Sequence, residues 1–195
     1  MIFLRKISLT RIRSALNFYL DTGTTTFLEW CFGLVVKSGL NNKIELAKTK
    51  KLKKSLGSCG DNLGIQHPIV VQGLEFVHFG SDVSIAAFVH IWGSGGVVIG
   101  DRVMIGTHTS ITSLTHDYTA RNMRVTLISQ PVTIEDDVWI GSNCVILPGV
   151  KLGCGCVIGA GSVVTENIPP NAIAVGVPAR VFKYRNVNMT DEVRR

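Results

Sequence analysis

The sequence contains no apolar run long enough to cross a membrane. Its longest apolar stretch near the start, WCFGLVV at residues 30–36, is far shorter than the roughly 20 residues that a membrane-spanning helix needs. A cleaved secretory signal is not expected either, because four cations interrupt the region that would have to be apolar. These cations are Arg5, Lys6, Arg11 and Arg13. We therefore expect a cytoplasmic protein.

Cysteine pairs with the spacing of a metal site or a disulfide framework are also missing. The five cysteines are an odd number, and no two of them form a C-x-x-C pair. Their positions are Cys31, Cys59, Cys144, Cys154 and Cys156. This pattern argues against both a disulfide framework and a zinc knuckle, so we expect reduced and mostly buried thiols, with no bound metal.

Charge is scarce in most of the chain and concentrated at its beginning. Residues 1–54 contain eleven lysines and arginines against three acidic residues, a net charge of +8, whereas residues 55–195 contain nine against eleven, a net charge of −2. Such a basic arm is typical of contact with an anionic membrane surface or with nucleic acid. A solvated helix face, such as KTKKLKK at residues 48–54, explains the charge more simply. We expect no nucleic acid partner and keep peripheral membrane contact through residues 1–54 as a candidate.

What the chain has instead is a six-residue repeat. From Ile134 onward an aliphatic residue recurs at every sixth position, and a second, mostly small residue follows each of them four positions later. The first series is Ile134, Ile140, Ile146, Leu152, Ile158 and Val164, and the second is Val138, Cys144, Val150, Cys156, Ser162 and Ile168. Upstream the same two series are Ile99, Ile105 and Ile111, with Val103, Thr109 and Thr115. A weaker trace at Val77, Val83 and Val89 precedes GSGG at residues 93–96, which shifts the phase.

A period of six differs from the 3.6-residue period of a helix and from the simple alternation of strands joined by hairpins. It suits a coil of short flat sides, in which one aliphatic side chain per side points inward and a glycine or small polar residue turns each corner. Stacked coils share one aliphatic core and parallel strand ladders, so the sequence predicts an all-β solenoid. In this frame Cys144 and Cys156 occupy inward positions.

Two segments without the repeat flank the solenoid. The segment NNKIELAKTKKLKKSLG at residues 41–57 is typical of a helix that begins at an asparagine and stops at a glycine. We expect a helical segment at residues 1–57 that caps the first coil, a β-helix at residues 58–185 and a short tail at residues 186–195. The repeat is interrupted after His116, and residues 117–131 are expected to form a projecting loop.

The later part of the chain resembles the hexapeptide-repeat O-acetyltransferases, which use acetyl-CoA. The resemblance covers about residues 77–185 and rests most on DVWIGSN, ILPGV, IGAGSVV and GVPAR. It implies a left-handed parallel β-helix and a homotrimer with active sites between subunits, although the usual preference for right-handed crossovers would predict the other hand. It also implies that the loop after the catalytic histidine reaches toward the neighbouring subunit and helps to enclose the site.

The resemblance assigns the general base to His116, in the string THDYT. An alcohol is a poor nucleophile until its proton is removed, and a neutral imidazole accepts a proton near neutral pH. Asp117 is a candidate to orient the imidazole, but neighbouring side chains often point apart, so its role stays open. Backbone amides near Gly141 and Ser142 are candidates to stabilise the oxyanion of the tetrahedral intermediate.

The resemblance also implies that acetyl-CoA lies along the groove between adjacent β-helices. Backbone groups at Ser142 and Ala160 match those that pair with the amides of the pantetheine arm, and Thr165 matches a position near the adenine end. Arg180 and Lys183 match the basic residues that meet the phosphates. A further aromatic position, which lines the acetyl and acceptor end, is matched by Trp139.

The acceptor side departs from the maltose and galactoside acetyltransferases. These carry an asparagine-rich stretch one coil before the histidine, whereas the corresponding region here, IAAFVHIWGSGG, has no asparagine. The string HDYT instead resembles the branch that acetylates surface polysaccharides such as O-antigen, capsule or exopolysaccharide units. A saccharide hydroxyl is therefore the expected acceptor, and a place at the inner face of the membrane would suit lipid-linked acceptors. His90 and Trp92 stay open as acceptor-binding residues.

Two other functions remain as alternatives. A xenobiotic O-acetyltransferase that acts on an antibiotic hydroxyl shares the same later motifs, and a non-catalytic β-helix scaffold would need no active site. The joint presence of His116, Trp139 and Arg180 argues against the scaffold. A γ-carbonic anhydrase has the same β-helix but needs three zinc-binding histidines, and the position five after His116 is Arg121.

Overall fold

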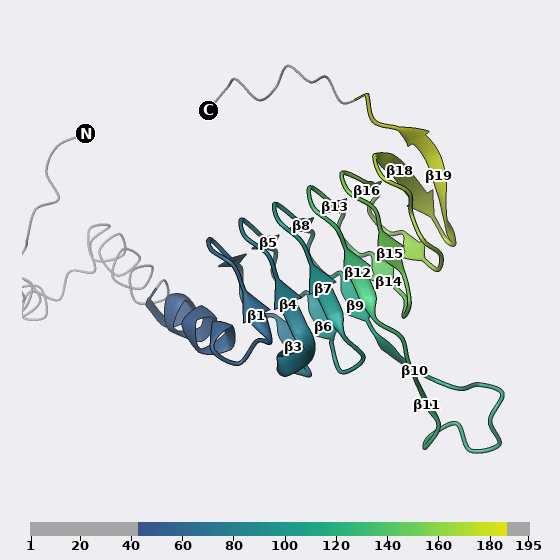
Figure 1. Cartoon of the computed structure of the whole chain (residues 1–195), viewed down its shortest axis with the longest axis horizontal. Helices are drawn as coiled ribbons and strands as arrows, with labels where there is room; N and C mark the ends of the chain where they lie inside the picture. The colour runs from purple at the N-terminus through teal and green to yellow at the C-terminus, as the bar shows by residue number, and fades with distance from the viewer. Residues whose placement is uncertain (1–42, 187–195) are drawn as a thin grey trace, which may run out of the picture. The chain divides into compact units, whose positions relative to one another are not determined.

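The computed structural model describes residues 43–186 of the chain. Residues 1–42 and 187–195 lie outside this part, and with them Cys31, most of the basic arm and nearly all of the expected C-terminal tail. Within residues 43–186 no helix is long and apolar enough to cross a membrane. The described part begins with a helix, and a solenoid of short strands follows it (Figure 1).

The helix covers residues 43–53, which are rich in lysine, leucine and alanine, all good helix formers. It ends four residues before Gly57, the stop that the sequence indicated. Oγ1 of Thr49 lies 3.1 Å from Nε2 of His67, which belongs to the first coil of the solenoid. This contact joins the helix to the coil that follows it.

Three sheets form the sides of the solenoid (Figure 1). Sheet 1 contains β1 (Ser58–Cys59), β4 (Val77–Phe79), β7 (Val97–Ile99), β12 (Val132–Ile134) and β15 (Lys151–Leu152). Sheet 2 contains β2 (Gly64–Ile65), β5 (Ser84–Ile85), β8 (Met104–Ile105), β13 (Trp139–Ile140), β16 (Val157–Ile158), β18 (Ala172–Gly176) and the antiparallel β19 (Ala179–Tyr184). Sheet 3 contains β3 (Val70–Gln72), β6 (His90–Trp92), β9 (Ser110–Thr112), β14 (Val145–Ile146) and β17 (Val163–Val164). Apart from β19 all of these strands pair in parallel, so the expected all-β solenoid, a left-handed parallel β-helix, is confirmed.

The chain passes from sheet 1 to sheet 2 to sheet 3 and back to sheet 1, so each coil has three corners. The first corner lies between sheets 1 and 2, at residues 60–62, 80–82, 100–102, 135–137, 153–155 and 169–171. The second corner lies between sheets 2 and 3, at residues 66–68, 86–88, 106–108, 141–143 and 159–161. The third corner lies between sheets 3 and 1 and includes the 3-10 helix η1 (Leu74–Phe76), residues 93–96 and residues 147–149.

The spacing of paired residues explains the shift of phase in the sequence. Trp139 pairs with Val157, eighteen positions later, which is three repeats of six. In the earlier coils the spacing is twenty, as between Ser84 and Met104. The two additional residues lie at the third corner, where residues 93–96 form the turn between β6 and β7. The phase shift is therefore a wider corner within an unbroken stack of coils.

Both series of repeat residues face the interior. Every member from Ile134 to Ile168 is buried, including Cys144 and Cys156, whose inward positions are confirmed. Burial raises the pKa of the Cys144 thiol and raises that of Cys156 to about 12, so both stay protonated and pack as small apolar side chains. Each fully buried isoleucine contributes about 1.5–3 kcal/mol relative to an exposed one. The stack of coils thus forms one aliphatic core.

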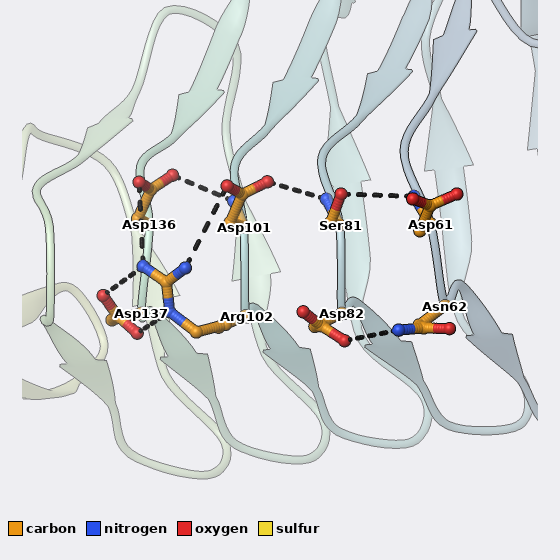
Figure 2. A network of polar contacts seen from close by, with 8 residues as sticks. All are labelled: Asp61, Asn62, Ser81, Asp82, Asp101, Arg102, Asp136 and Asp137. Carbon is orange, nitrogen blue, oxygen red and sulfur yellow. Dashed lines mark hydrogen bonds and ion pairs between the residues drawn. The ribbon is translucent and has the colours of Figure 1, made fainter. Parts of the chain in front are cut away.

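Side chains at the first corner form a ladder along the solenoid (Figure 2). The backbone N–H of Ser81 donates to Oδ1 of Asp101 at 2.7 Å, and the N–H of Asp101 donates to Oδ1 of Asp136 at 2.9 Å. One position later, Arg102 donates to both carboxylate oxygens of Asp137, at 2.7 and 2.8 Å. The hydrogen bond from Arg102 holds the pKa of Asp137 below its ordinary value. The ladder satisfies amides to which the turn gives no backbone partner.

An antiparallel hairpin of β10 (Leu114–His116) and β11 (Leu127–Ser129) replaces the third corner of one coil and projects from the solenoid (Figure 1). The repeat predicted an inward position for Thr115, and this prediction is wrong because Thr115 is exposed. The chain leaves the coil directly after the buried Ser113, so the antiparallel pairing of β10 begins before His116.

Ser113 fixes the base of this hairpin. Its hydroxyl donates to the carbonyl oxygen of Trp92 at 2.7 Å and accepts from the N–H of Gly95 at 2.9 Å. Its carbonyl oxygen accepts from the N–H of Gln130, where the second arm returns to the coil. A buried serine with both hydroxyl functions used holds the two arms at one point of the third corner.

Candidate active site

His116 is the last residue of β10 and lies opposite Leu127 of β11. Its side chain is exposed, and Nδ1 lies 2.6 Å from the carbonyl oxygen of Met123, in the connection between the two strands. A carbonyl oxygen only accepts hydrogen bonds, so Nδ1 carries the proton and the neutral ring has its lone pair on Nε2. The hairpin therefore holds His116 in the tautomer that a general base at Nε2 requires.

Asp117 does not supply the partner of the imidazole. Its Oδ1 accepts from the N–H and from the hydroxyl of Thr119, at 2.8 and 2.6 Å. The hydrogen bond from the Thr119 hydroxyl holds the pKa of Asp117 below its ordinary value. The carboxylate thus stabilises the turn of the hairpin, while the carbonyl group of Met123 contacts the ring. Sequence reasoning missed Met123 because any residue type offers a backbone carbonyl.

Gly141, Ser142 and Ala160 lie together at the second corner, in two successive coils. The N–H of Gly141 donates to the carbonyl oxygen of Ile158, and the N–H of Gly161 donates to that of Ser142, both at 2.8 Å. A Cβ atom on Gly141 would lie 2.6 Å from the backbone nitrogen of Ala160, so the coils stack this closely only with glycine there. The structure thus brings these three predicted residues together.

The amides of this corner differ in their availability. The N–H of Gly141 is already bonded to Ile158, whereas those of Ser142 and Ala160 have no acceptor among residues 43–186. From Ala87 to Ala160 the second position of this corner carries small side chains, so no carboxylate reaches these amides from the next coil. Ser142 and Ala160 therefore present two open donors, one coil apart, about 4.8 Å in a parallel stack. A ligand with two carbonyl oxygens in an extended chain matches such a pair.

Trp139 lies beside this corner on the outer face of sheet 2. Its neighbours in the adjacent coils are Met104 and Val157, and 52% of its surface is exposed. The exposed part of Trp139, between apolar neighbours, forms an apolar surface on the outside of sheet 2. It borders the open amides, because Gly141 and Ser142 follow it after a single buried residue.

Arg180 and Lys183 lie on β19, at the end of sheet 2. Nη2 of Arg180 lies 3.5 Å from Oε1 of Glu166, and Nη1 donates to the carbonyl oxygen of Ala179. Thr165 precedes Glu166 after β17, so it lies near this ion pair in the last coil. The pair is exposed and contributes little to stability, so a stronger anion can displace the carboxylate from Arg180.

His90 and Trp92, the residues left open for acceptor binding, lie on β6 in sheet 3. Their ring centroids are 6.1 Å apart, and Nε2 of His90 is buried without a hydrogen-bond partner among the described residues. The carbonyl oxygen of Trp92 accepts from Ser113 at the base of the hairpin. The two rings therefore lie on the side of the solenoid that carries His116, away from Trp139 on sheet 2.

One chain does not bring all the predicted residues together. His116 projects from the third corner, whereas Trp139 lies on sheet 2, the opposite side of a three-sided coil. Ser142 and Ala160 lie at the second corner, at the far end of sheet 3, and a side of six residues spans up to roughly 20 Å. Two shallow hollows among residues 43–186 lie beside Glu135, away from both the hairpin at the third corner and the amides at the second corner.

Comparison with known proteins identifies the repeat. A family model, the hexapeptide repeat of succinyl-transferase, matches residues 131–166. Galactoside O-acetyltransferase of Escherichia coli is 35% identical over 144 residues, which are 73% of this chain and 71% of that enzyme. The WbbJ protein of Escherichia coli, named for O-acetyl transfer in lipopolysaccharide biosynthesis, is 35% identical over 58% of this chain and 63% of that protein.

Solved structures share the same architecture. A hexapeptide-repeat acetyltransferase of Vibrio cholerae, crystallised with acetyl coenzyme A, superposes with a TM-score of 0.69 and 31% identity. The match covers 72% of this chain and 77% of that chain. These matches cover a larger share of the chain than residues 131–166, which the family model matches.

Proposed function

Because this chain belongs to the hexapeptide-repeat acetyl-CoA-dependent O-acetyltransferases, we propose that it moves an acetyl group from acetyl-CoA to a hydroxyl group of a saccharide. The observation that carries this proposal is the hydrogen bond from Nδ1 of His116 to the carbonyl oxygen of Met123, which leaves Nε2 as the basic nitrogen. An enzyme that acetylates hydroxyl groups needs such a base, and a scaffold does not.

In the proposed reaction, Nε2 of His116 takes the proton of the acceptor hydroxyl while the oxygen attacks the thioester carbonyl carbon of acetyl-CoA. The carbonyl electron pair moves to oxygen and gives a tetrahedral oxyanion. When this intermediate collapses, the C–S bond breaks and the CoA thiolate leaves, taking the proton back from Nε2. The carbonyl oxygen of Met123 stabilises the transient imidazolium, because it accepts from Nδ1–H throughout.

We assign the oxyanion to the open amide of Ser142 and a carbonyl oxygen of the pantetheine arm to the open amide of Ala160. Gly141 serves by allowing the close stack, since its own N–H is bonded to Ile158. Trp139 then packs against the acetyl end. Arg180, Lys183 and Thr165 of the last coils bind the phosphates and the adenine end, and Arg180 exchanges Glu166 for a phosphate.

A homotrimer would complete this site. His116 and the open amides lie on different sides of one chain, so a single subunit cannot place the base beside the thioester. A second copy that offers its second corner to the hairpin of the first unites the two halves, and threefold symmetry closes the arrangement. The projecting hairpin suits this role, since it extends away from its own solenoid (Figure 1).

For the acceptor we favour a sugar unit of a surface polysaccharide. WbbJ, with 35% identity, is named for lipopolysaccharide biosynthesis. The net charge of +8 in residues 1–54 would favour an anionic membrane face, where lipid-linked saccharides are held. This assignment concerns the substrate only and leaves the chemistry at His116 unchanged.

The test is the release of free thiol from acetyl-CoA, measured with free sugars, nucleotide sugars, polysaccharide repeat units and chloramphenicol as acceptors. We expect turnover with a saccharide and a fall of about 10²-fold or more in His116→Ala. Asp117→Asn is the matched control, because that carboxylate binds Thr119 and should matter little to the rate. Turnover with chloramphenicol alone would make the protein a xenobiotic acetyltransferase, and no turnover with any acceptor would contradict the proposal.

A further inference from the structure

Two aromatic side chains stack on each other at the second corner, ahead of the open amides. The rings of Phe88 and His108 have centroids 4.8 Å apart and planes that differ by 21°. Both residues are exposed, and Phe88 has 55% of its surface accessible. They occupy the third position of the corner in two successive coils, the position that Asn143 and Gly161 hold in the later coils.

The backbone makes phenylalanine an unexpected residue at this position. Phe88 has φ of 64°, in the left-handed region that asparagine and glycine adopt at lower cost. Asn143 has φ of 58° and Gly161 has φ of 75° at the equivalent places. Because the Phe88 ring is exposed, it also contributes little hydrophobic free energy to folding. Folding alone would therefore favour asparagine or glycine at position 88, and a strained, exposed aromatic residue indicates a binding role.

Hydrogen bonds fix the ring of His108. The hydroxyl of Thr107 lies 2.6 Å from the carbonyl oxygen of Ala87 and 2.8 Å from Nδ1 of His108. The hydroxyl has one proton, which it donates to the carbonyl oxygen, so it accepts from Nδ1–H of His108. In the neutral ring Nε2 is then an acceptor without a partner among residues 43–186. The stacked pair thus offers an apolar face on Phe88 and one hydrogen-bond acceptor on His108.

The position of the pair follows from the proposed course of acetyl-CoA. The phosphates meet β19, the pantetheine arm meets Ala160, and the thioester meets Ser142 one coil earlier. At the same corner, His108 lies one coil before Ser142 and Phe88 lies two coils before it. At the spacing of parallel strands these positions are about 5 and 10 Å from Ser142. The acceptor must lie next to the thioester, on the side away from the pantetheine arm. Phe88 and His108 lie on that side, where a sugar ring has to bind.

We propose that Phe88 and His108 form the platform that binds the acceptor, with the C–H face of a pyranose ring on Phe88 and a ring hydroxyl donating to Nε2 of His108. This inference rests on the proposed function and names the substrate class of that site: a pyranoside with one apolar face and a free hydroxyl beside it. Phe88 and His108 position the sugar, and His116 of a neighbouring copy performs the chemistry.

The decisive variant is Phe88→Asn, because asparagine fits the left-handed backbone. We expect the KM for the saccharide acceptor to rise at least about tenfold, while the KM for acetyl-CoA stays unchanged. The melting temperature should stay the same or rise, because asparagine adopts this backbone conformation at lower cost. His108→Asn should also raise the acceptor KM. The matched control is Phe76→Asn, which removes another exposed phenylalanine from η1, outside this corner, and should leave both KM values within twofold.

Each result decides the proposal. A normal acceptor KM in Phe88→Asn, with wild-type turnover intact, would overturn the platform and leave the acetyltransferase function standing. Loss of the assembled state in Phe88→Asn, measured by native mass, would show that the pair is a contact between copies and would also overturn it. Absence of turnover in the wild-type protein would refute the proposed function, and the platform with it.

Discussion

The first and second corners of the solenoid have similar backbone turns but differ in the N–H of their second residue, which a side chain binds at the first corner and which stays open at the second. At the first corner a side chain accepts from the second-position N–H in four coils, at distances of 2.7 to 3.2 Å. These amides belong to Asp61, Ser81, Asp101 and Cys154. Figure 2 shows the contacts of Asp61, Ser81 and Asp101. At the second corner the corresponding amides of Ser142 and Ala160 have no acceptor among the described residues. Side chains thus satisfy most second-position amides of the first corner, whereas the amides of Ser142 and Ala160 at the second corner stay open.

The difference lies in the side chains and not in the turn. Both corners place their third residue in the left-handed region, as in Asp137 and Asn143, with φ of 59° and 58°. Aspartate or serine at the first corner reaches the amide of the neighbouring coil, whereas Ala160 has no group that can do so. A uniform repeat can therefore carry separate structural and binding edges by changing one residue per turn.

A substitution in sheet 2, which joins the first and second corners, should have the largest effect on stability. Ile140 is fully buried in sheet 2, directly before the second corner and after the first. Ile140→Ala should lower the free energy of unfolding by about 2–5 kcal/mol, because it removes buried surface and creates a cavity. Chemical denaturation measures this loss. The adjacent exposed Trp139→Ala should cost far less stability, and an equal loss in both would mean that Ile140 is not part of the core.

Removing the open N–H of Ala160 is the sharpest test of the comparison. Proline already occupies the second position of the third corner at Pro148 and of the first corner at Pro170, so the turn accepts a proline ring at that position. Ala160→Pro therefore removes one N–H of the second corner at a place where the ring fits. We expect the KM for acetyl-CoA to rise about three- to tenfold, the size of one hydrogen bond, with an unchanged melting temperature. Steady-state kinetics with varied acetyl-CoA would reveal the change. An unaltered KM would mean that this amide does not meet the cofactor arm.

Removing a side-chain acceptor from the first corner should lower stability and leave acetyl-CoA binding unchanged. Asp101→Ala removes the acceptor of the Ser81 amide and should destabilise the protein by about 1 kcal/mol, with no change in the KM for acetyl-CoA. Asp101→Asn keeps an oxygen at the same place and should recover most of the loss. Thermal unfolding of the two variants side by side decides the matter, since equal losses would assign the effect to charge and not to the capped amide.

The smallest expected effect depends on pH. The pKa of Asp137 is lowered in the folded state by Arg102, so the pair stabilises the protein above the unfolded pKa of about 4 and this contribution is lost as pH falls through the lowered folded value. Because the pair is largely exposed, Arg102→Met should cost less than about 1 kcal/mol at pH 7 and still less at pH 3. Unfolding curves at both pH values would reveal this. A larger cost in acid would contradict the sign.

The fold was readable from the sequence because one side chain in each set of six must point inward. Ile134, Ile158 and Cys156 were placed correctly for that reason. Thr115 was misplaced because it continues the spacing by chance, and only the antiparallel pairing with Ile128 takes it out of the coil. A periodic pattern records burial and says nothing about where a segment changes its pairing partner.

The candidate site was less accessible to sequence reasoning. The contact of His116 with Met123 uses a backbone carbonyl, which leaves no trace in residue types. The ladder from Asp101 to Asp136 joins residues 35 positions apart, with the hairpin between them, and is visible only once the register is known. The stack of Phe88 on His108 requires the same knowledge, since two corners twenty residues apart become neighbours.

The hydrogen bonds of Ser113 at the base of the hairpin have a consequence for dynamics. The coils on either side of the hairpin pair directly with each other, so they hold their register whatever the hairpin does. Ser113 anchors the base of the hairpin to the body, and the pairing of β10 with β11 holds its two arms to each other and not to a coil, which makes the hairpin a separate, less protected unit for hydrogen exchange. Its amides should therefore exchange well before those of the coils. Assembly with a neighbouring copy would slow that exchange, which makes the hairpin a natural reporter of subunit docking.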